Sequence, residues 1–359
     1  MKKGLFKGLL SLAVALCFTA GNAQAAPSGQ VFNPQSGDGD ADGPVIVSSS
    51  EAARWYHAVD SIDFSPRHNT LIYGPDSTYR PMDEAWFQSE LVAPGTWRIL
   101  SDGDYIYLVE GDTAAICIDT GYGTGNLRRY CQTLTSKPVR YVINTHSHFD
   151  HTADDAYFDC VFMYAAGVPL ATRPYASFKG ISFPRHYPVV TVDDGYVFHL
   201  GNRDLEVLVI PNHTGDGIAL LDRSHRILFS GDEILSDRMA KLNVSVAQYA
   251  VNMQKLVNAI GDYDLILGGA VRFTDVSCVK RLLACARHIL DGGADEPDAT
   301  ATKPHFVQQH PAVLEGAEAL FVRHAPREGD SAGPEAPASA YTRMSYGGVT
   351  IMYLKDKVK

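Results

Sequence analysis

The chain lacks an excess of positive charge. It contains 31 lysine and arginine residues against 41 aspartate and glutamate residues, which gives a formal net charge of −10. Proteins that bind nucleic acid neutralise phosphates with clustered lysine and arginine, and no basic stripe occurs in this sequence. The composition therefore argues against a nucleic-acid partner.

Apolar runs long enough to cross a bilayer are also missing. The apolar stretch at residues 9–18 is too short, because a membrane helix needs about 20 such residues. Lysines precede this stretch and Ala23-Gln24-Ala25 follows it, which is the pattern of a secretory signal peptide. We expect residues 1–25 to be removed after Ala25, leaving a secreted or periplasmic protein of net charge −13 without a stable membrane anchor.

Cysteine is sparse, and five of the six cysteines remain after removal of the signal peptide. An odd number excludes a complete set of disulfides within one chain. Cys278 and Cys285 lie in one expected helix, roughly 10 Å apart along its axis, which is too far for a bond. We expect the cysteines to be mostly buried and structural, with a bridge between Cys131 and Cys160 left as an open alternative.

Histidine, in contrast, is concentrated in one place. Residues 141–143 form an apolar, β-branched run that predicts a buried strand, and His146, His148, Asp150 and His151 follow it directly. Neutral imidazole nitrogens and carboxylate oxygens are ligands that suit zinc, iron or manganese. Residues two apart in an extended turn project to the same side, so His146 and His148 can share one ion. The spacing predicts a metal site at the carboxyl end of a strand.

This pattern, His146-x-His148-x-Asp150-His151, resembles the signature of the metallo-β-lactamase superfamily. The resemblance implies an α/β fold, a four-layer αββα sandwich of two mixed β-sheets flanked by helices. It also implies a site that usually holds two metal ions and hydrolyses esters, thioesters, lactones, amides or phosphate esters. The expected cofactor is Zn²⁺, as one or two ions, with iron or manganese as alternatives.

Two later residues agree with the resemblance. His213 and Asp232 each come just after an apolar strand, expected at residues 205–210 and 227–229. Alone, each is more often an ordinary loop residue, but with the signature they resemble the family's third histidine and its metal-bridging aspartate. The ligand set implied by the resemblance is His146, His148, Asp150, His151, His213 and Asp232.

One position departs from the family pattern. The family usually closes the second site with a histidine after a strand and a glycine-rich turn, whereas here Gly268-Gly269 is followed by Ala270, which cannot ligate. The first site, made by His146, His148 and His213 with Asp232 beside it, is complete. The second site, made by Asp150, His151 and Asp232, is short of one ligand. Water, weak binding of the second ion or a distant histidine are the alternatives. The distant histidines are His186, His288, His305 and His310.

A further carboxylate ends another expected strand. Asp119-Thr120-Gly121 resembles the turn that precedes the first helix in this family. Such a residue more often orients a loop than binds a metal ion directly. We therefore expect Asp119 to be a loop-orienting carboxylate.

The expected chemistry follows from charge. A divalent ion held by three neutral imidazoles lowers the pKa of its bound water towards neutrality and polarises a carbonyl group. Asp150 is near enough in sequence to orient the resulting hydroxide or to shuttle its proton, which makes it the candidate catalytic residue. The hypothesis is an exported metal-dependent hydrolase of a small-molecule lactone, thioester or lactam.

Two alternatives remain beside this hypothesis. The resemblance ranks β-lactamase lower, because those members typically carry cysteine or serine near Asp232, whereas glyoxalase- and lactonase-like members carry aspartate. The second alternative is an exported metal- or ligand-binding protein that kept the scaffold and lost turnover. A positioned base at Asp150 argues against that second alternative. No pattern in the sequence specifies the substrate or the oligomeric state.

The rest of the chain is organised around one domain. Residues 26–85 are poorly patterned and predict an N-terminal arm, and residues 86–290 contain the metallo-β-lactamase-fold domain. Residues 291–338 predict a mobile insertion with one short helix near 313–322. Residues 339–359 predict a β-hairpin that docks at the edge of the second sheet and completes the domain.

Periodicity predicts the elements of this domain. Strands are expected at residues 97–100, 105–110, 114–119, 139–143, 161–165, 205–210, 218–221, 227–229 and 265–267. Helices are expected at residues 126–134, 154–158, 246–260 and 276–290, with Thr274 as the cap of the last. Residues 173–190 form an aromatic, proline-rich loop that either shapes the substrate pocket or covers the surface.

Overall fold

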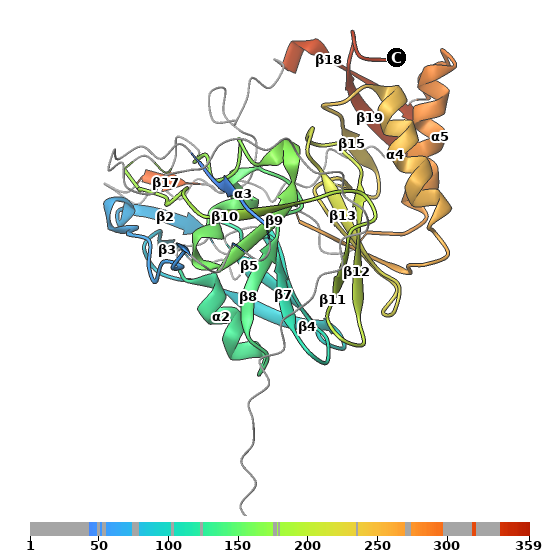
Figure 1. The fold of residues 1–359 in the computed structure, drawn as a ribbon. Helices are drawn as coiled ribbons and strands as arrows, with labels where there is room; N and C mark the ends of the chain where they lie inside the picture. The colour runs from blue at the N-terminus through green and yellow to red at the C-terminus, as the bar shows by residue number, and fades with distance from the viewer. Residues whose placement is uncertain are drawn as a thin grey trace, which may run out of the picture.

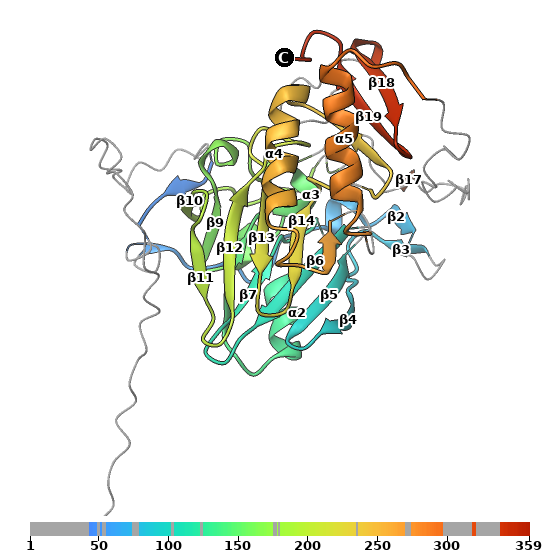
Figure 2. The same cartoon turned by 90° about the vertical axis from the view of Figure 1, so that its right-hand side faces the viewer.

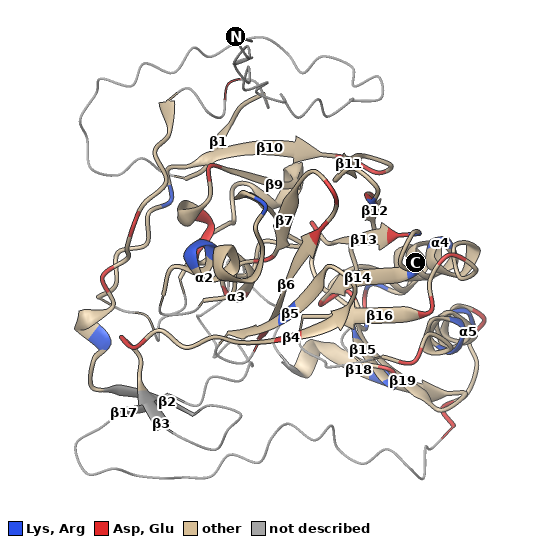
Figure 3. Cartoon of the chain, turned by 90° about the horizontal axis from the view of Figure 1, so that it is seen from below, with Lys and Arg blue, Asp and Glu red and all other residues tan. Residues whose placement is uncertain are grey.

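The computed structural model describes residues 43–48, 51, 55–73, 79–101, 104–122, 125–174, 178, 180–234, 236–269, 274–296, 318–320 and 338–359. The expected signal peptide, Ala270, His305 and His310 lie outside these residues. Within the described residues, no helix is long and apolar enough to cross a membrane. Charged residues of both signs are interspersed along the chain in Figure 3.

The first sheet has eight strands. Its β4–β7 strands form an antiparallel meander, and β8, β9, β10 and β1 continue from β7 in parallel. The strands, in their order across the sheet, are β1 (Val45–Ile46), β10 (Pro188–Val192), β9 (Cys160–Tyr164), β8 (Val139–Ile143), β7 (Ala115–Ile118), β6 (Asp104–Glu110), β5 (Thr96–Ser101) and β4 (Gln88–Ala93). Parallel strands are buried on both faces, which explains why β7 and β9 are almost wholly apolar.

The second sheet has five strands, of which only β14 and β16 run parallel to each other. They are β11 (Val197–His199), β12 (Asp204–Val209), β13 (Ile218–Asp222), β14 (Ile227–Gly231) and β16 (Leu265–Gly268). The strands that were expected lie within one or two residues of their predicted ranges, so alternating and continuous apolar runs placed them. Strands β1, β4, β10 and β11 were not expected, and β10 includes the end of the stretch predicted to be an aromatic loop.

Helices cover the outer face of each sheet, as Figures 1 and 2 show. Those beside the first sheet are α2 (Leu127–Leu134) and α3 (Phe149–Thr152), and those over the second are α4 (Val246–Asn258) and α5 (Cys278–Leu290). Three buried apolar clusters lie between the layers: one under α2, one between the sheets and one under α4 and α5. The fold is thus the αββα sandwich that the resemblance implied.

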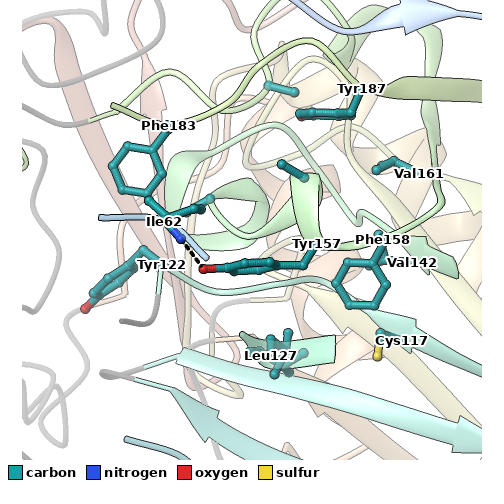
Figure 4. Close-up of a cluster of buried hydrophobic side chains, with 14 of the residues drawn as sticks. Ile62, Cys117, Tyr122, Leu127, Val142, Tyr157, Phe158, Val161, Phe183 and Tyr187 are labelled. Atoms are coloured by element: carbon teal, nitrogen blue, oxygen red, sulfur yellow. Dashed lines mark hydrogen bonds between the residues drawn. The ribbon is translucent and has the colours of Figure 1, made fainter. Parts of the chain in front are cut away.

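The N-terminal arm packs onto the cluster under α2. The backbone N–H of Ile62 donates to the hydroxyl of Tyr157 at 3.0 Å, as Figure 4 shows, and Phe64 and Met82 are buried in the same cluster. The arm also contains a short 3₁₀ helix, Ser65–Arg67, and the strands β2 (Thr70–Tyr73) and β3 (Tyr79–Pro81). Burial of its apolar side chains against the domain holds the arm in place.

The structure modifies three local expectations. The short helix expected at residues 154–158 is present as a 3₁₀ helix, Asp155–Tyr157, and an α-helical turn, α3, lies inside the histidine motif itself. Helix α5 begins after Ser277, because Thr274 pairs with Ile266 in an isolated β-bridge and is not available as its cap.

The third of these lies in the insertion. Residues 318–320, in the region of the expected helix at 313–322, form strand β17 (Glu318–Leu320), which pairs in parallel with β2. Pairing with the edge of β2 gives hydrogen-bond partners to backbone groups that would be unpaired at the ends of a short helix.

The C-terminal hairpin forms as expected but docks elsewhere. Its strands β18 (Tyr341–Tyr346) and β19 (Val349–Leu354) join through two glycines with positive φ angles, 60° and 76°. The hairpin pairs with β15 (Met239–Lys241) in a separate three-stranded sheet, not at the edge of the second sheet. Val349 and Ile351 are fully buried in the cluster with α4 and α5, and this burial selects the position.

The five described cysteines are all free and buried, so the bridge between Cys131 and Cys160 is not formed. The Sγ atom of Cys131, on α2, lies 3.5 Å from Sγ of Cys117, on β7. Cys160 begins β9 and its thiol contacts the carbonyl of Val161. Packing of α2 over β7 directs Cys131 away from Cys160.

Candidate metal centre

The histidine motif lies where strand β8 ends. His146 follows the strand by three residues, His148 occupies the N-cap position of α3, and Asp150 and His151 lie within that helix. Two backbone contacts hold the turn: the N–H of Ile218 donates to the carbonyl of Thr145 at 2.8 Å, and the Asn144 side chain donates to the carbonyl of His151 at 3.0 Å. The motif is therefore a rigid turn between the two sheets.

Strands of the second sheet supply the two later residues. His213 follows β12, and its ring Nε2 lies 3.1 Å from Nδ1 of His148. Asp232 follows β14 directly, and its Oδ2 lies 3.8 Å from Nε2 of His151 and 4.0 Å from Nε2 of His213. Because both sheets end at this edge, residues up to 86 positions apart in the sequence meet here.

The described side chains form three overlapping groups of metal-ligand size, in each of which the donor atoms lie within 4.8 Å of one another. The groups are His146, His148 and His213; His146, His151 and Asp232; and Asp104, Asp150 and His151. All six residues proposed from the sequence thus belong to at least one group. The third group contains Asp104, which no sequence pattern had indicated.

Asp119 orients two imidazoles of this centre, one directly and one through Thr145. Its Oδ2 lies 2.9 Å from Nδ1 of His151, and its two oxygens accept from the backbone N–H and the hydroxyl of Thr145 at 2.6 and 2.8 Å. The Thr145 hydroxyl in turn lies 3.1 Å from Nδ1 of His146. Hydrogen bonding at Nδ1 leaves the Nε2 lone pair of each imidazole for a metal ion. Asp119 therefore has the orienting role expected from the sequence.

The backbone at Asp119 is strained. Its φ angle is 61°, in the left-handed region that non-glycine residues seldom occupy. The N–H of Asp119 donates to the carbonyl of Ile143 at 2.9 Å, which ties the turn to the end of β8. This conformation places one carboxylate against two residues of the histidine turn, Thr145 and His151.

Glu233 plays a comparable part for the His213 loop. Its buried carboxyl group accepts from the backbone N–H groups of Asn212, His213 and Thr214, at 2.5, 2.8 and 3.4 Å. Burial raises the pKa of Glu233 to about 8. This residue follows Asp232 directly, and sequence patterns did not distinguish it from a surface glutamate.

Burial and charge give the imidazoles different proton affinities. Burial, followed by the charges of neighbouring histidines, lowers the pKa of His146 well below 6.5, and burial with the nearby His148 lowers that of His213 to about 3. Burial also lowers the pKa of His151, but Asp119, Asp150 and Asp232 outweigh it and hold that pKa well above 6.5. The carboxylates that favour a proton on His151 equally favour a divalent cation in its place.

The residues present fit a metal ion. Three buried imidazole nitrogens have no hydrogen-bond partner among the described residues: Nε2 of His146, Nε2 of His151 and Nδ1 of His213. Buried polar atoms in folded proteins nearly always have a partner, and an ion is one explanation for those that do not. His148 and His213 are only partly buried, so solvent and substrate can reach this side of the centre.

Of the distant histidines proposed to replace a ligand at position 270, the two that the structure describes, His186 and His288, do not reach the centre. The ring of His186 packs against Trp55, with centroids 5.2 Å apart. His288 stacks on Tyr346 and its Nε2 lies 2.8 Å from the carbonyl of Ala294, beyond α5. Neither belongs to a group of metal-ligand size among the described residues.

The aromatic loop at residues 173–190 supports the motif from the other side. Phe178 and Phe183 are buried, and both pack against Phe149 with ring centroids 4.8 Å away. Phe149 begins α3, between His148 and Asp150. The described part of the loop therefore stabilises the helix that holds two of the predicted site residues.

Comparison with known proteins agrees with this geometry. A sequence profile described as "Metallo-beta-lactamase superfamily" matches residues 102–270. Acyl-coenzyme A thioesterase MBLAC2 of Gallus gallus is 29% identical over 211 residues, which cover 49% of this chain and 76% of that protein. The Homo sapiens MBLAC2 is 28% identical over 161 residues, covering 36% of this chain and only 57% of its own length.

Solved structures resemble the chain more distantly. A metallo-β-lactamase from Erythrobacter litoralis has 20% sequence identity and a TM-score of 0.45, covering 56% of this chain and 96% of that one. The profile match includes the complete histidine motif, His213 and Asp232, and the structure places their side chains in adjoining groups between the two sheets of an αββα sandwich. By the profile match, residues 102–270 form a hydrolase domain of the metallo-β-lactamase superfamily.

Proposed function

We propose that this protein is an exported metal-dependent hydrolase that cleaves an activated carbonyl group in a small molecule, with thioesters as the first substrate class and lactones as the second. The observation that carries the proposal is the group formed by His146, His148 and His213, with unpaired buried nitrogens and a carboxylate, Asp150, in an adjoining group. This arrangement combines neutral metal ligands with a base.

The chain's own residues prepare the reaction. A divalent cation bound here would supply Lewis acidity and make a water molecule nucleophilic near neutral pH. Asp119 keeps the Nδ1 protons of the imidazoles engaged and their Nε2 lone pairs directed inward. Asp150, which is 4% exposed, accepts the proton of the attacking water. As the acyl carbon–sulfur bond breaks, Asp150 returns that proton to the leaving thiolate.

Two observations favour a thioester. Two of the relatives, from Gallus gallus and Homo sapiens, carry the name acyl-coenzyme A thioesterase, and Asp232 occupies the place where, by the family resemblance, β-lactamases carry cysteine or serine. A lactone shares the activated ester-type carbonyl, and it suits an exported enzyme. The expectation of export rests on the signal-like residues 1–25.

The proposal can be tested with purified residues 26–359, loaded with Zn²⁺ after chelation. Thiol release from acyl thioesters would be measured by a colour reagent, and lactone opening by a pH indicator. We expect turnover that requires the metal and that falls by roughly a hundredfold or more in Asp150→Asn. Asp193→Asn removes an equivalent charge from an exposed loop and should change nothing.

Each result has a defined meaning. Turnover that survives thorough chelation, or that is equal in Asp150→Asn and wild type, contradicts the proposed mechanism. Metal binding without hydrolysis of any thioester, lactone or lactam favours the binding-protein alternative. Preferential opening of a lactam ring would transfer the assignment to β-lactamase.

A further inference from the structure

The family pattern expects a histidine at position 270, where this chain has alanine, and a buried carboxylate, Asp104, belongs to a group of metal-ligand size. The described structure ends this region at Gly269, one residue before Ala270, whose methyl group has no ligand atom. The third group of metal-ligand size contains Asp150 and His151, both expected at the second site, together with Asp104. We propose that Asp104 is a protein ligand of the second metal ion and takes the role that the family gives to the residue at position 270.

Hydrogen bonds between the two sheets explain how a residue so distant in sequence reaches this place. Asp104 begins β6 in the first sheet, and the backbone N–H of the next residue, Tyr105, donates to the carbonyl of Gly269 at 2.8 Å. The hydroxyl of Tyr107 donates to the carbonyl of Gly268 at 2.6 Å. The start of β6 therefore lies beside the end of β16, where the chain continues to position 270.

The surroundings of Gly269 show how close the end of β16 lies to the metal centre. A Cβ atom added at Gly269 would lie 2.6 Å from Oδ1 of Asp232 and 2.6 Å from Cε1 of His151. The backbone thus lies directly against two of the expected second-site residues. Asp104 is held next to this segment by the hydrogen bond of its neighbour Tyr105, and its side chain shares a group of metal-ligand size with His151.

Distance and burial agree with ligation. The donor atoms of Asp104, Asp150 and His151 lie within 4.8 Å of one another, and a cation about 2.1 Å from each of its ligands needs separations of this size. Asp104 is 1% exposed and His151 is 1% exposed. The buried Nε2 atom of His151 has no hydrogen-bond partner among the described residues, and it is shared between this group and the one with Asp232.

The substitution changes the chemistry of the site. With Asp104, Asp150 and Asp232 around one imidazole, the second site is richer in carboxylate oxygen than the three-histidine group. Oxygen ligands favour harder ions, so Mn²⁺ or Fe²⁺ should compete better with Zn²⁺ at the second site than at the first. The net negative charge also compensates a dication within a buried environment.

This inference rests on the proposed metal centre, and metal content tests it without an activity assay. The mature protein would be stripped, loaded with Zn²⁺ or with Mn²⁺, passed through gel filtration and subjected to elemental analysis, with calorimetric titration for affinity. We expect two equivalents in wild type and one in Asp104→Asn, whose second-site Kd should rise at least about tenfold. Asp104→His supplies a different ligand at the same position and should retain two equivalents.

A matched control and a folding check accompany these variants. Glu110→Gln alters a carboxylate at the other end of β6 and should bind two equivalents. Thermal unfolding of the stripped proteins establishes that each variant is folded. Should Asp104→Asn not fold, Asp104→His still tests the inference, because a loss of the second ion in a folded Asp104→His contradicts ligation from this position.

The outcomes separate this inference from the proposed function. Two equivalents of unchanged affinity in Asp104→Asn overturn the role of Asp104. One equivalent in wild type also overturns it, while the first site and the proposed hydrolase mechanism stand. No bound metal in wild type overturns both.

Discussion

Oδ2 of Asp119 lies 2.9 Å from Nδ1 of His151, and the same oxygen accepts a hydrogen bond from the Thr145 hydroxyl, which contacts His146. One carboxylate at the end of β7 thus sets the orientation of two imidazoles from the next loop. The centre depends on this residue although Asp119 itself belongs to no group of metal-ligand size.

Replacing Asp119 with asparagine should weaken metal binding. The amide nitrogen would donate where Thr145 and His151 now donate, so His151 would have to protonate Nε2, the atom needed for a cation. We expect about a 10- to 100-fold rise in metal Kd, measured by competition with a chromophoric chelator. The exposed variant Asp193→Asn is the control. Unchanged affinity in Asp119→Asn would show that the carboxylate does not orient the ligands.

Glu233→Ala should destabilise the loop that presents His213. Three backbone N–H groups would lose their acceptor, and unsatisfied buried donors cost about 1–3 kcal/mol each. We expect a loss of roughly 3 kcal/mol or more in urea unfolding. Glu233→Gln keeps an acceptor oxygen and is neutral, like the native side chain below its raised pKa of about 8, so it should lose much less. Equal losses in the two variants would contradict this account.

Asp155 should make stability depend on pH. Burial raises the pKa of Asp155 to about 8, although hydrogen bonds from Asn144, Tyr187 and Thr120 lower it. In the unfolded chain an aspartate has a pKa of about 3.9. Between these values the native chain holds a proton that the unfolded chain has released. The contribution of Asp155 to the free energy of unfolding is therefore complete at low pH. It declines by about 1.4 kcal/mol per pH unit as the pH rises from the unfolded pKa to the native pKa.

Asp155→Asn should remove that slope. Urea unfolding of wild type and variant, at several pH values between about 5 and about 8, measures the difference between their curves. We expect the stability of the variant relative to wild type to rise steadily with pH. A constant difference across the range would mean that Asp155 is ionised in the native protein.

Removal of metal should lower thermal stability. A ligand present at a hundred times its Kd stabilises the native state by about 2.7 kcal/mol, which is roughly 5–10 °C in Tm for a domain of this size. Chelation of the loaded protein should produce a shift of this order in calorimetry. The shift should be smaller in His148→Ala, which lacks one member of the three-histidine group. A chelator effect of equal size in His148→Ala would assign the stabilising ion to another place.

Sequence alone determined whatever depends on neighbouring residues. Apolar runs and their polar ends placed β5–β9, β12–β14 and β16, because side-chain burial repeats along each strand with a fixed period, whereas β1, β4, β10 and β11 were not expected. Four polar groups within six residues indicated the metal loop, and similar strand ends indicated His213 and Asp232. Helical spacing placed α4 and α5 for the same local reason.

Only the tertiary structure decided which distant segments meet. Nothing near Asp104 in the sequence marks it, and it joins the centre because Tyr105 pairs with Gly269, 164 residues later. Glu233 holds the His213 loop because its carboxyl group meets backbone N–H groups of residues that lie about 20 positions earlier in the sequence. The C-terminal hairpin pairs with β15 because α4 and α5 cover its apolar face there. Such contacts arise when whole layers pack together, and they produce no repeating pattern of apolar and polar residues in the segments that make them.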